Sequence, residues 1–327
     1  MRNILGIGAL LIAAALALAA VGALPACSHV SSLASDAGTE TDTMDTDSHE
    51  FSLDGPCDSN ELVGGFSVEA RNIGTLEAPI EHSEVTGAIA DGVNWGATPV
   101  LREDAGECEL YEFSPWDCTP ACEAGAMCND EGECVPYPTN LDVGTVVVDG
   151  LVVPVQIEPD ASFDYTYQGP DLPCPPYEPG QEILLRVEGG SGIDEMILDG
   201  MGVEKLEVES IDYHMSDNEE MVVTWIPGDT PEAEVHGEFS INEEGSFPMW
   251  IYCTWDDAAG SGTVPASLVH ELMVDLLESP LMGDATATLE RRTVDSIQID
   301  HGCIEFRVSA QLKLNLTYDP PSVGGGV

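Results

Sequence analysis

The chain has 327 residues, 43% of them hydrophobic, which is enough for one large or two modest domains. Its 9 Lys and Arg face 60 Asp and Glu, which gives a formal net charge of −51. Nucleic acids and anionic lipid headgroups are bound by neutralising their phosphates with Lys and Arg, so this composition excludes both classes of partner.

Residues 1–26 have the pattern of an export signal, in which an uncharged apolar run follows Arg2. The segment Leu24-Pro25-Ala26-Cys27 resembles the lipobox of bacterial lipoproteins, from whose usual pattern it departs at the proline. The resemblance implies that the signal is removed and that lipid on Cys27 anchors the exported protein in the cell envelope, at the outer membrane. The alternatives are an ordinary secretory signal and an uncleaved membrane helix.

Two terminal segments are expected to be disordered. Residues 27–56 are rich in Ser, Thr, Asp and Gly and contain no Lys or Arg, so they are predicted to form an acidic tether. Residues 319–327 are mainly Pro and Gly and form the predicted disordered tail.

Residues 57–138 are predicted to form a small β unit that ends in a cysteine-rich module. Alternating apolar residues such as Phe66, Val68 and Ala70 are typical of half-buried strands. The module contains Cys118, Cys122, Cys128 and Cys134, with Cys108 upstream. So short a segment cannot build a core, so disulfides are expected to stabilise it in an exported protein. A zinc site is the alternative, but the cysteine spacings do not match paired C-x-x-C knuckles.

The cysteine-rich module resembles small EGF-like and Dickkopf-like modules. The stretch from Cys118 to Pro138, which ends Cys-Val-Pro-Tyr-Pro, is similar to one in uncharacterised lipoproteins of myxobacteria. A weaker similarity extends over residues 57–316. The resemblance implies no particular activity, and the missing C-x-C pair means that it implies no EGF calcium site.

Residues 139–318 are predicted to form an antiparallel β-sandwich or jelly-roll-like domain, which makes the fold class all-β. The clearest strand is Ile304–Leu316, where apolar and polar residues alternate without a break. Further strand candidates are 143–148, 151–157, 182–187, 204–208, 221–226, 235–241 and 249–255. One short helix is expected between Pro265 and Ser279-Pro280, because Leu268, Leu272 and Leu276 lie on one helical stripe.

The cysteine count leaves one cysteine over. If Cys27 is lipidated, nine cysteines remain, so at least one is unpaired or pairs between chains. The disulfide candidates are Cys57, Cys108, Cys118, Cys122, Cys128, Cys134, Cys253 and Cys303. Cys253 and Cys303 lie in strong strand candidates and are expected to pair with each other, and the cysteines between 118 and 134 are expected to pair among themselves.

No specific catalytic motif occurs in the sequence. His270-Glu271 begins like the zincin motif H-E-x-x-H, but Val274 occupies the place of the second zinc ligand. The sequence also lacks a G-x-S-x-G elbow and a Walker loop. These absences favour a binding or structural role without enzymatic activity. An extracytoplasmic hydrolase, acting on polysaccharide through two carboxylates, is the alternative.

No cofactor is predicted, although acidic turns at 129–132, 242–245 and 255–257 raise the question of calcium. The alternative is an acidic surface that is simply solvated.

An extracellular glycan or protein is the expected type of ligand. Aromatic residues at strand spacing, Phe163, Tyr165 and Tyr167 in one run and Trp250 with Tyr252 in another, are candidates for a glycan platform. The alternative is that they fill the core or stabilise strand pairs.

Overall fold

The computed structural model describes residues 50–73, 79–113, 116–242, 249–278 and 284–319. The export signal, Cys27 and all but the first residue of the predicted tail therefore lie outside the described residues. The described part consists of strands, one 3-10 turn (η1, Asp257–Ala259) and one α-helix, so the predicted all-β fold with a disulfide-rich region is confirmed.

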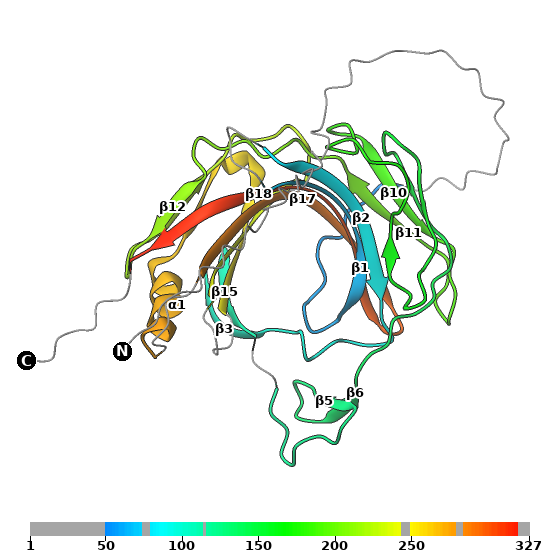
Figure 1. Cartoon of the computed structure of the whole chain (residues 1–327), viewed down its shortest axis with the longest axis horizontal. Helices are drawn as coiled ribbons and strands as arrows, with labels where there is room; N and C mark the ends of the chain where they lie inside the picture. The colour runs from blue at the N-terminus through cyan, green and yellow to red at the C-terminus, as the bar shows by residue number, and fades with distance from the viewer. Residues whose placement is uncertain (1–49, 74–78, 114–115, 243–248, 279–283, 320–327) are drawn as a thin grey trace, which may run out of the picture.

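One large sheet organises the molecule, and Figure 1 shows it bent into an arch. Its strands, in spatial order, are β3 (Val100–Ala105), β4 (Cys108–Glu112), β15 (Met249–Asp256), β14 (Glu234–Asn242), β17 (Asp284–Ile299), β18 (Gly302–Tyr318), β1 (Leu62–Asn72), β2 (Glu81–Ile89) and β9 (Tyr165–Thr166), with β12 (Asp212–Met215) beside β18.

The hairpin of β17 and β18 lies at the centre of this sheet. Their strands have 16 and 17 residues and pair from Ala287↔Leu314 to Ile299↔Gly302. Side chains alternate between the two faces of a strand. In β18 the residues Ile304, Phe306 and Val308 are fully buried on one face, whereas Arg307 and Gln311 lie on the other.

The apolar face of the arch is its outer face, and two groups of elements cover it (Figure 1). At one end lies a second sheet of β11 (Met196–Met201), β10 (Glu182–Val187), β7 (Val146–Asp149) and β8 (Val155–Ile157). At the other end lie the β13 (Met221–Thr224) and β16 (Ser261–Val264) pair and helix α1 (Ala266–Glu278). Each group buries its own hydrophobic cluster against the large sheet, which produces a sandwich-like arrangement.

Helix α1 forms where the sequence predicts it. Leu268, Val269, Leu272 and Met273 are buried within the second cluster, so the apolar stripe faces the sheet. Pro265 precedes the helix, and its carbonyl accepts the first helical hydrogen bond from the Val269 N–H.

Two features of the topology depart from the sequence prediction. The chain contains parallel pairs, β1 with β18 and β12 with β18, although the other strand pairs are antiparallel. In addition, β1 to β4 precede the boundary expected at 138/139 yet lie in the same sheet as β14, β15, β17 and β18. Long-range strand pairing leaves no local signal in the sequence, so neither feature was visible there.

Four disulfides join the eight candidate cysteines, and Cys174 is the described cysteine outside them. The pairing within the cysteine-rich module is confirmed as Cys118–Cys128 and Cys122–Cys134. The expected Cys253–Cys303 pair is wrong. Cys253 lies directly opposite Cys108 in the β4–β15 register and bonds to it, and Cys303 bonds to Cys57.

The end of the predicted tether is attached to the sheets. The N–H of Ser52 donates to Asp199 at 2.9 Å, and the N–H of Asp54 donates to Asp295 at 3.0 Å. The N–H of Cys57 donates to Glu305 at 2.7 Å, beside the disulfide to Cys303. Residues 50–56 were expected to be disordered, but these bonds order at least part of them.

The burial of Arg291 accounts for two differences from the sequence prediction: strand β17 was not predicted, and the strand predicted at 204–208 does not form. The residue is buried in β17 with 1% of its side chain exposed, paired at 2.9 Å with Asp257, which is 4% exposed. It also donates to the carbonyls of Glu204, Lys205 and Ile226. The charge obscured the apolar pattern of β17, and the predicted strand 204–208 is instead a loop whose carbonyls bind this guanidinium.

Replacing Arg291 with Met is expected to lower the free energy of unfolding by about 3–5 kcal/mol, because it removes the cationic partner of the buried Asp257 carboxylate and leaves it with the hydrogen bond from the Gly228 N–H. Guanidinium chloride unfolding measures this loss. The control is Arg186→Met, which removes an exposed pair with Asp149 (53% and 50% exposed) and should change stability by less than about 1 kcal/mol. Equal effects of the two substitutions would contradict the structural role of Arg291.

Candidate functional site

The polar face of the large sheet, on the inside of the arch, is the strongest candidate site (Figure 1). It arises from the strand positions that alternate with the buried apolar ones. We call it the inner face and define it by Glu69, Arg71, Glu84, Tyr111, Glu234, His236, Glu238, Trp250, Tyr252, Glu290, Arg292 and Arg307.

An ion-pair network covers one half of the inner face. Glu69 receives hydrogen bonds from Arg71 at 2.6 Å and from Arg307 at 2.8 Å. Arg307 also lies 3.4 Å from Glu290, and Arg292 donates to Glu234 at 2.8 Å. Each of these three guanidinium groups is therefore already paired with carboxylates.

The network sets the ionisation of its members. Burial raises the pKa of Glu69, but Arg307 and Arg71 outweigh burial and hold that pKa below its ordinary value. Burial lowers the pKa of Arg307, but Glu290 and Glu69 outweigh burial and raise it. Both side chains are consequently charged at neutral pH, and the arginines do not offer free charge to an anionic ligand.

An aromatic row occupies the other half of the inner face; it consists of His236, Tyr252, Trp250, Tyr111 and Phe113. The rings of Trp250 and Tyr252 stack with centroids 6.1 Å apart and an angle of 11° between planes. His236 stacks on Tyr252 at 5.6 Å. Tyr111 contacts Tyr252 at 5.7 Å, and Phe113 contacts Trp250 at 6.3 Å. The row combines residues from β14, β15 and the end of β4.

Two titratable groups lie where the aromatic row meets the ion pairs. Glu238 is opposite Tyr252 in the β14–β15 register. Burial and then the charge of Glu290 raise the pKa of Glu238 above its ordinary value. Burial and then Arg292 and Arg307 lower the pKa of His236 well below its ordinary value. The imidazole is thus neutral, and the ionised form of Glu238 is less favourable here than it is in water.

A cavity of about 520 Å³ adjoins the aromatic row at Tyr111. We call it the tryptophan pocket; Trp95, Trp116, Tyr111, Asp58, Glu109 and Asp130 are among its lining residues. Trp95 and Trp116 meet edge to face at 6.2 Å. The buried Nε1–H of Trp116 has no acceptor among the described residues. A buried donor without a partner costs about 1–3 kcal/mol.

Tyr111 connects the pocket to the row. Its hydroxyl donates to Glu109 at 2.9 Å. Burial, then Glu109, raises the pKa of Tyr111 well above its ordinary value, so the phenol remains protonated.

The two aromatic runs that were candidates for a glycan platform lie in different environments. Tyr165 is fully buried in the first hydrophobic cluster, where its hydroxyl oxygen accepts a 2.9 Å hydrogen bond from the Val143 N–H. Tyr167 packs against the same cluster, whereas Phe163 is 37% exposed and is not part of it. Trp250 and Tyr252, by contrast, form the centre of the aromatic row.

The other candidate residues do not assemble into a site. His270 is exposed on α1, where a 2.6 Å bond to Asp217 raises its pKa. Asp256 caps the 3-10 turn by accepting from Ala258, and Asp257 pairs with Arg291, so these carboxylates have structural partners. The turn at 129–132 is closed by a bond from the Glu133 N–H to Asn129. Most of the turn at 242–245 lies outside the described residues.

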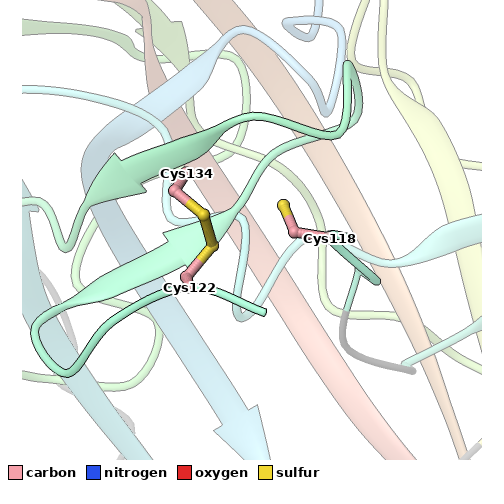
Figure 2. A group of neighbouring side chains, drawn as sticks. All are labelled: Cys118, Cys122 and Cys134. Atoms are coloured by element: carbon pink, nitrogen blue, oxygen red, sulfur yellow. A yellow bond between two sulfur atoms is a disulfide. The ribbon is translucent and has the colours of Figure 1, made fainter. Parts of the chain in front are cut away.

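The cysteine-rich module brings three sulfurs together. The sulfurs of Cys118, Cys122 and Cys134 lie within 4.8 Å of one another, and Figure 2 shows the Cys122–Cys134 bridge beside Cys118. Cys118 is bonded to Cys128. All of these sulfurs are in disulfides, whereas zinc requires thiolates. The β5 (Ala126–Cys128) and β6 (Cys134–Pro136) hairpin is thus held by two cross-links.

Several residues of the site were not predicted from the sequence: Asp58, Trp95, Trp116, Phe113 and the ion pairs of Glu69. They lie on different strands and loops. The alternation of Tyr111 in β4 and Phe113 just after it was the available signal, but it did not indicate which residues would lie beside them.

Searches of protein-family models and of curated proteins find no match to this chain. Among the described residues, no helix has the length and apolar character needed to cross a membrane.

Replacing Glu238 with Gln is expected to stabilise the protein at neutral pH. The folded-state pKa of Glu238 lies above its ordinary value of 4.5, so its ionisation costs stability as pH rises through that folded pKa. The variant should gain on the order of 1 kcal/mol at pH 7 and nothing near pH 4. Denaturant unfolding at both pH values measures the difference. The control is E182Q, at a glutamate that is exposed, and it should leave the free energy of unfolding nearly unchanged. An E238Q variant that is less stable than the wild type at pH 7 would refute the raised pKa of Glu238.

Proposed function

We propose that this chain is an exported, lipid-anchored binding protein whose inner face holds an extracellular glycan. The observation that carries the proposal is the aromatic row of His236, Tyr252, Trp250, Tyr111 and Phe113 on an otherwise polar face. The row lies on the side of the sheet that the second sheet and α1 leave uncovered (Figure 1).

The chemistry of the inner face suits a sugar. The apolar C–H face of a sugar ring stacks on an aromatic ring, and its hydroxyls exchange hydrogen bonds with carboxylates and neutral imidazole. The inner face supplies both types of group, in Tyr252 with Trp250 and in Glu238 with His236. Anionic polymers are disfavoured because the protein carries a net charge of −51 and the arginines of this face are paired.

The anchor is the second component of the proposal. The lipobox-like segment at Cys27 supports lipidation, and four disulfides are typical of a protein that matures outside the cytoplasm. Mass spectrometry of the native amino terminus tests the anchor. We expect a mature chain that begins at acylated Cys27, and an unmodified thiol at this position would refute it.

Replacing Tyr252 with Ala should weaken glycan binding at least 10-fold, because the ring contacts Trp250, Tyr111 and His236 and its loss disrupts the row. Glycan arrays followed by calorimetry with the best neutral oligosaccharide measure the affinity. Tyr137→Ala, at a tyrosine that is 56% exposed outside the row, is the matched control. Equal affinities of the two variants would contradict the proposed binding face.

Hydrolysis of the glycan is the second candidate function. The observation that favours it is the raised pKa of Glu238, with the charged Glu290 among its causes, on the same aromatic face. Glycosidases use one carboxyl that stays protonated and a second that stays ionised. Chromatography of the glycan after incubation decides between the two functions: chain shortening that E238Q abolishes would establish a hydrolase.

A further inference from the structure

The tryptophan pocket differs in charge from the rest of the inner face. Its lining contains the carboxylates of Asp58, Glu109 and Asp130 but no Lys, Arg or His. On the inner face, by contrast, each arginine is paired with at least one glutamate. The pocket therefore concentrates negative charge that its own lining does not neutralise.

Two of these carboxylates are available to a ligand. Glu109 accepts the hydroxyl of Tyr111. No hydrogen bond or ion pair to the carboxylate of Asp58 or Asp130 is formed within the described part of the chain. Both residues are exposed, so their charge faces the solvent of the open cavity.

The aromatic rings of the pocket add a second attraction for cations. A cation within about 6 Å of a Trp or Tyr ring is attracted by the negative face of the ring. Charge-assisted hydrogen bonds to carboxylates are roughly twice as strong as neutral ones. The lining of the pocket combines both types of group, since two tryptophans and a tyrosine lie beside three carboxylates.

We infer that the tryptophan pocket binds an amino sugar of the glycan, with the ammonium group between the carboxylates and the aromatic rings. Tyr111 belongs to both the pocket and the aromatic row, so one oligosaccharide can occupy both. The volume of about 520 Å³ lies within the range of small-molecule sites. The inference rests on the proposed glycan-binding function and specifies its ligand.

A matched pair of oligosaccharides tests the inference: a glucosamine oligomer and the N-acetylglucosamine oligomer of the same length. The nitrogen is a charged amine in the first oligomer and carries a neutral acetyl group in the second. At pH 6 and low salt, calorimetry with the disulfide-intact protein should show at least 10-fold tighter binding of the glucosamine oligomer. The double variant D58N/D130N should lose this preference. The double variant D194N/E195Q, which removes the same charge from an exposed loop, should retain it.

The outcomes separate the two proposals. If both oligomers bind equally and Tyr252→Ala weakens both, the amino-sugar inference fails and the glycan-binding function stands. If neither oligomer binds and no other glycan does, both fail. If a lysine oligopeptide binds more tightly than the glucosamine oligomer and depends on Asp58 and Asp130, the ligand of the pocket is a protein and the inference is overturned.

Discussion

The rest of the structure depends on one constraint: the β17–β18 hairpin is curved and has one mainly apolar face and one mainly polar face. Most of its outer side chains are apolar and must be buried, so the second sheet and α1 pack against them. Its inner side chains are mainly polar, and neither the second sheet nor α1 lies on that side of the hairpin (Figure 1). The hairpin therefore creates a core on one side and the inner face on the other, and the neighbouring strands extend both surfaces.

Because basic residues are scarce, the few arginines determine where carboxylates can be buried or brought close together. With 9 Lys and Arg in 327 residues, most carboxylates have no cationic partner. Arg291 compensates a buried carboxylate between the sheet and a loop, whereas Arg71, Arg292 and Arg307 allow glutamates to crowd together on the inner face. The lining of the tryptophan pocket contains carboxylates but no Lys, Arg or His, so it lacks such compensation.

The amino-terminal segment couples the proposed anchor to the binding surface. Ser52, Asp54 and Cys57 are held to three different acidic side chains, and the Cys57–Cys303 disulfide makes the attachment covalent. The next residue, Asp58, lines the tryptophan pocket. The proposed tether thus leads directly into one wall of the candidate site.

Sequence alone determined the all-β class, the strand at β18, helix α1 and the local disulfides of the cysteine-rich module, because alternation, helical periodicity and short cysteine spacing are local properties. It did not reveal β17, since Arg291 and Asp295 interrupt the apolar pattern and only their partners in space make them core residues. Nor did it reveal the partners of Cys253 and Cys303, or that Tyr111, Trp116 and Asp58 share one pocket. Those contacts join residues far apart in the chain, and the register of the folded sheet alone brings them together.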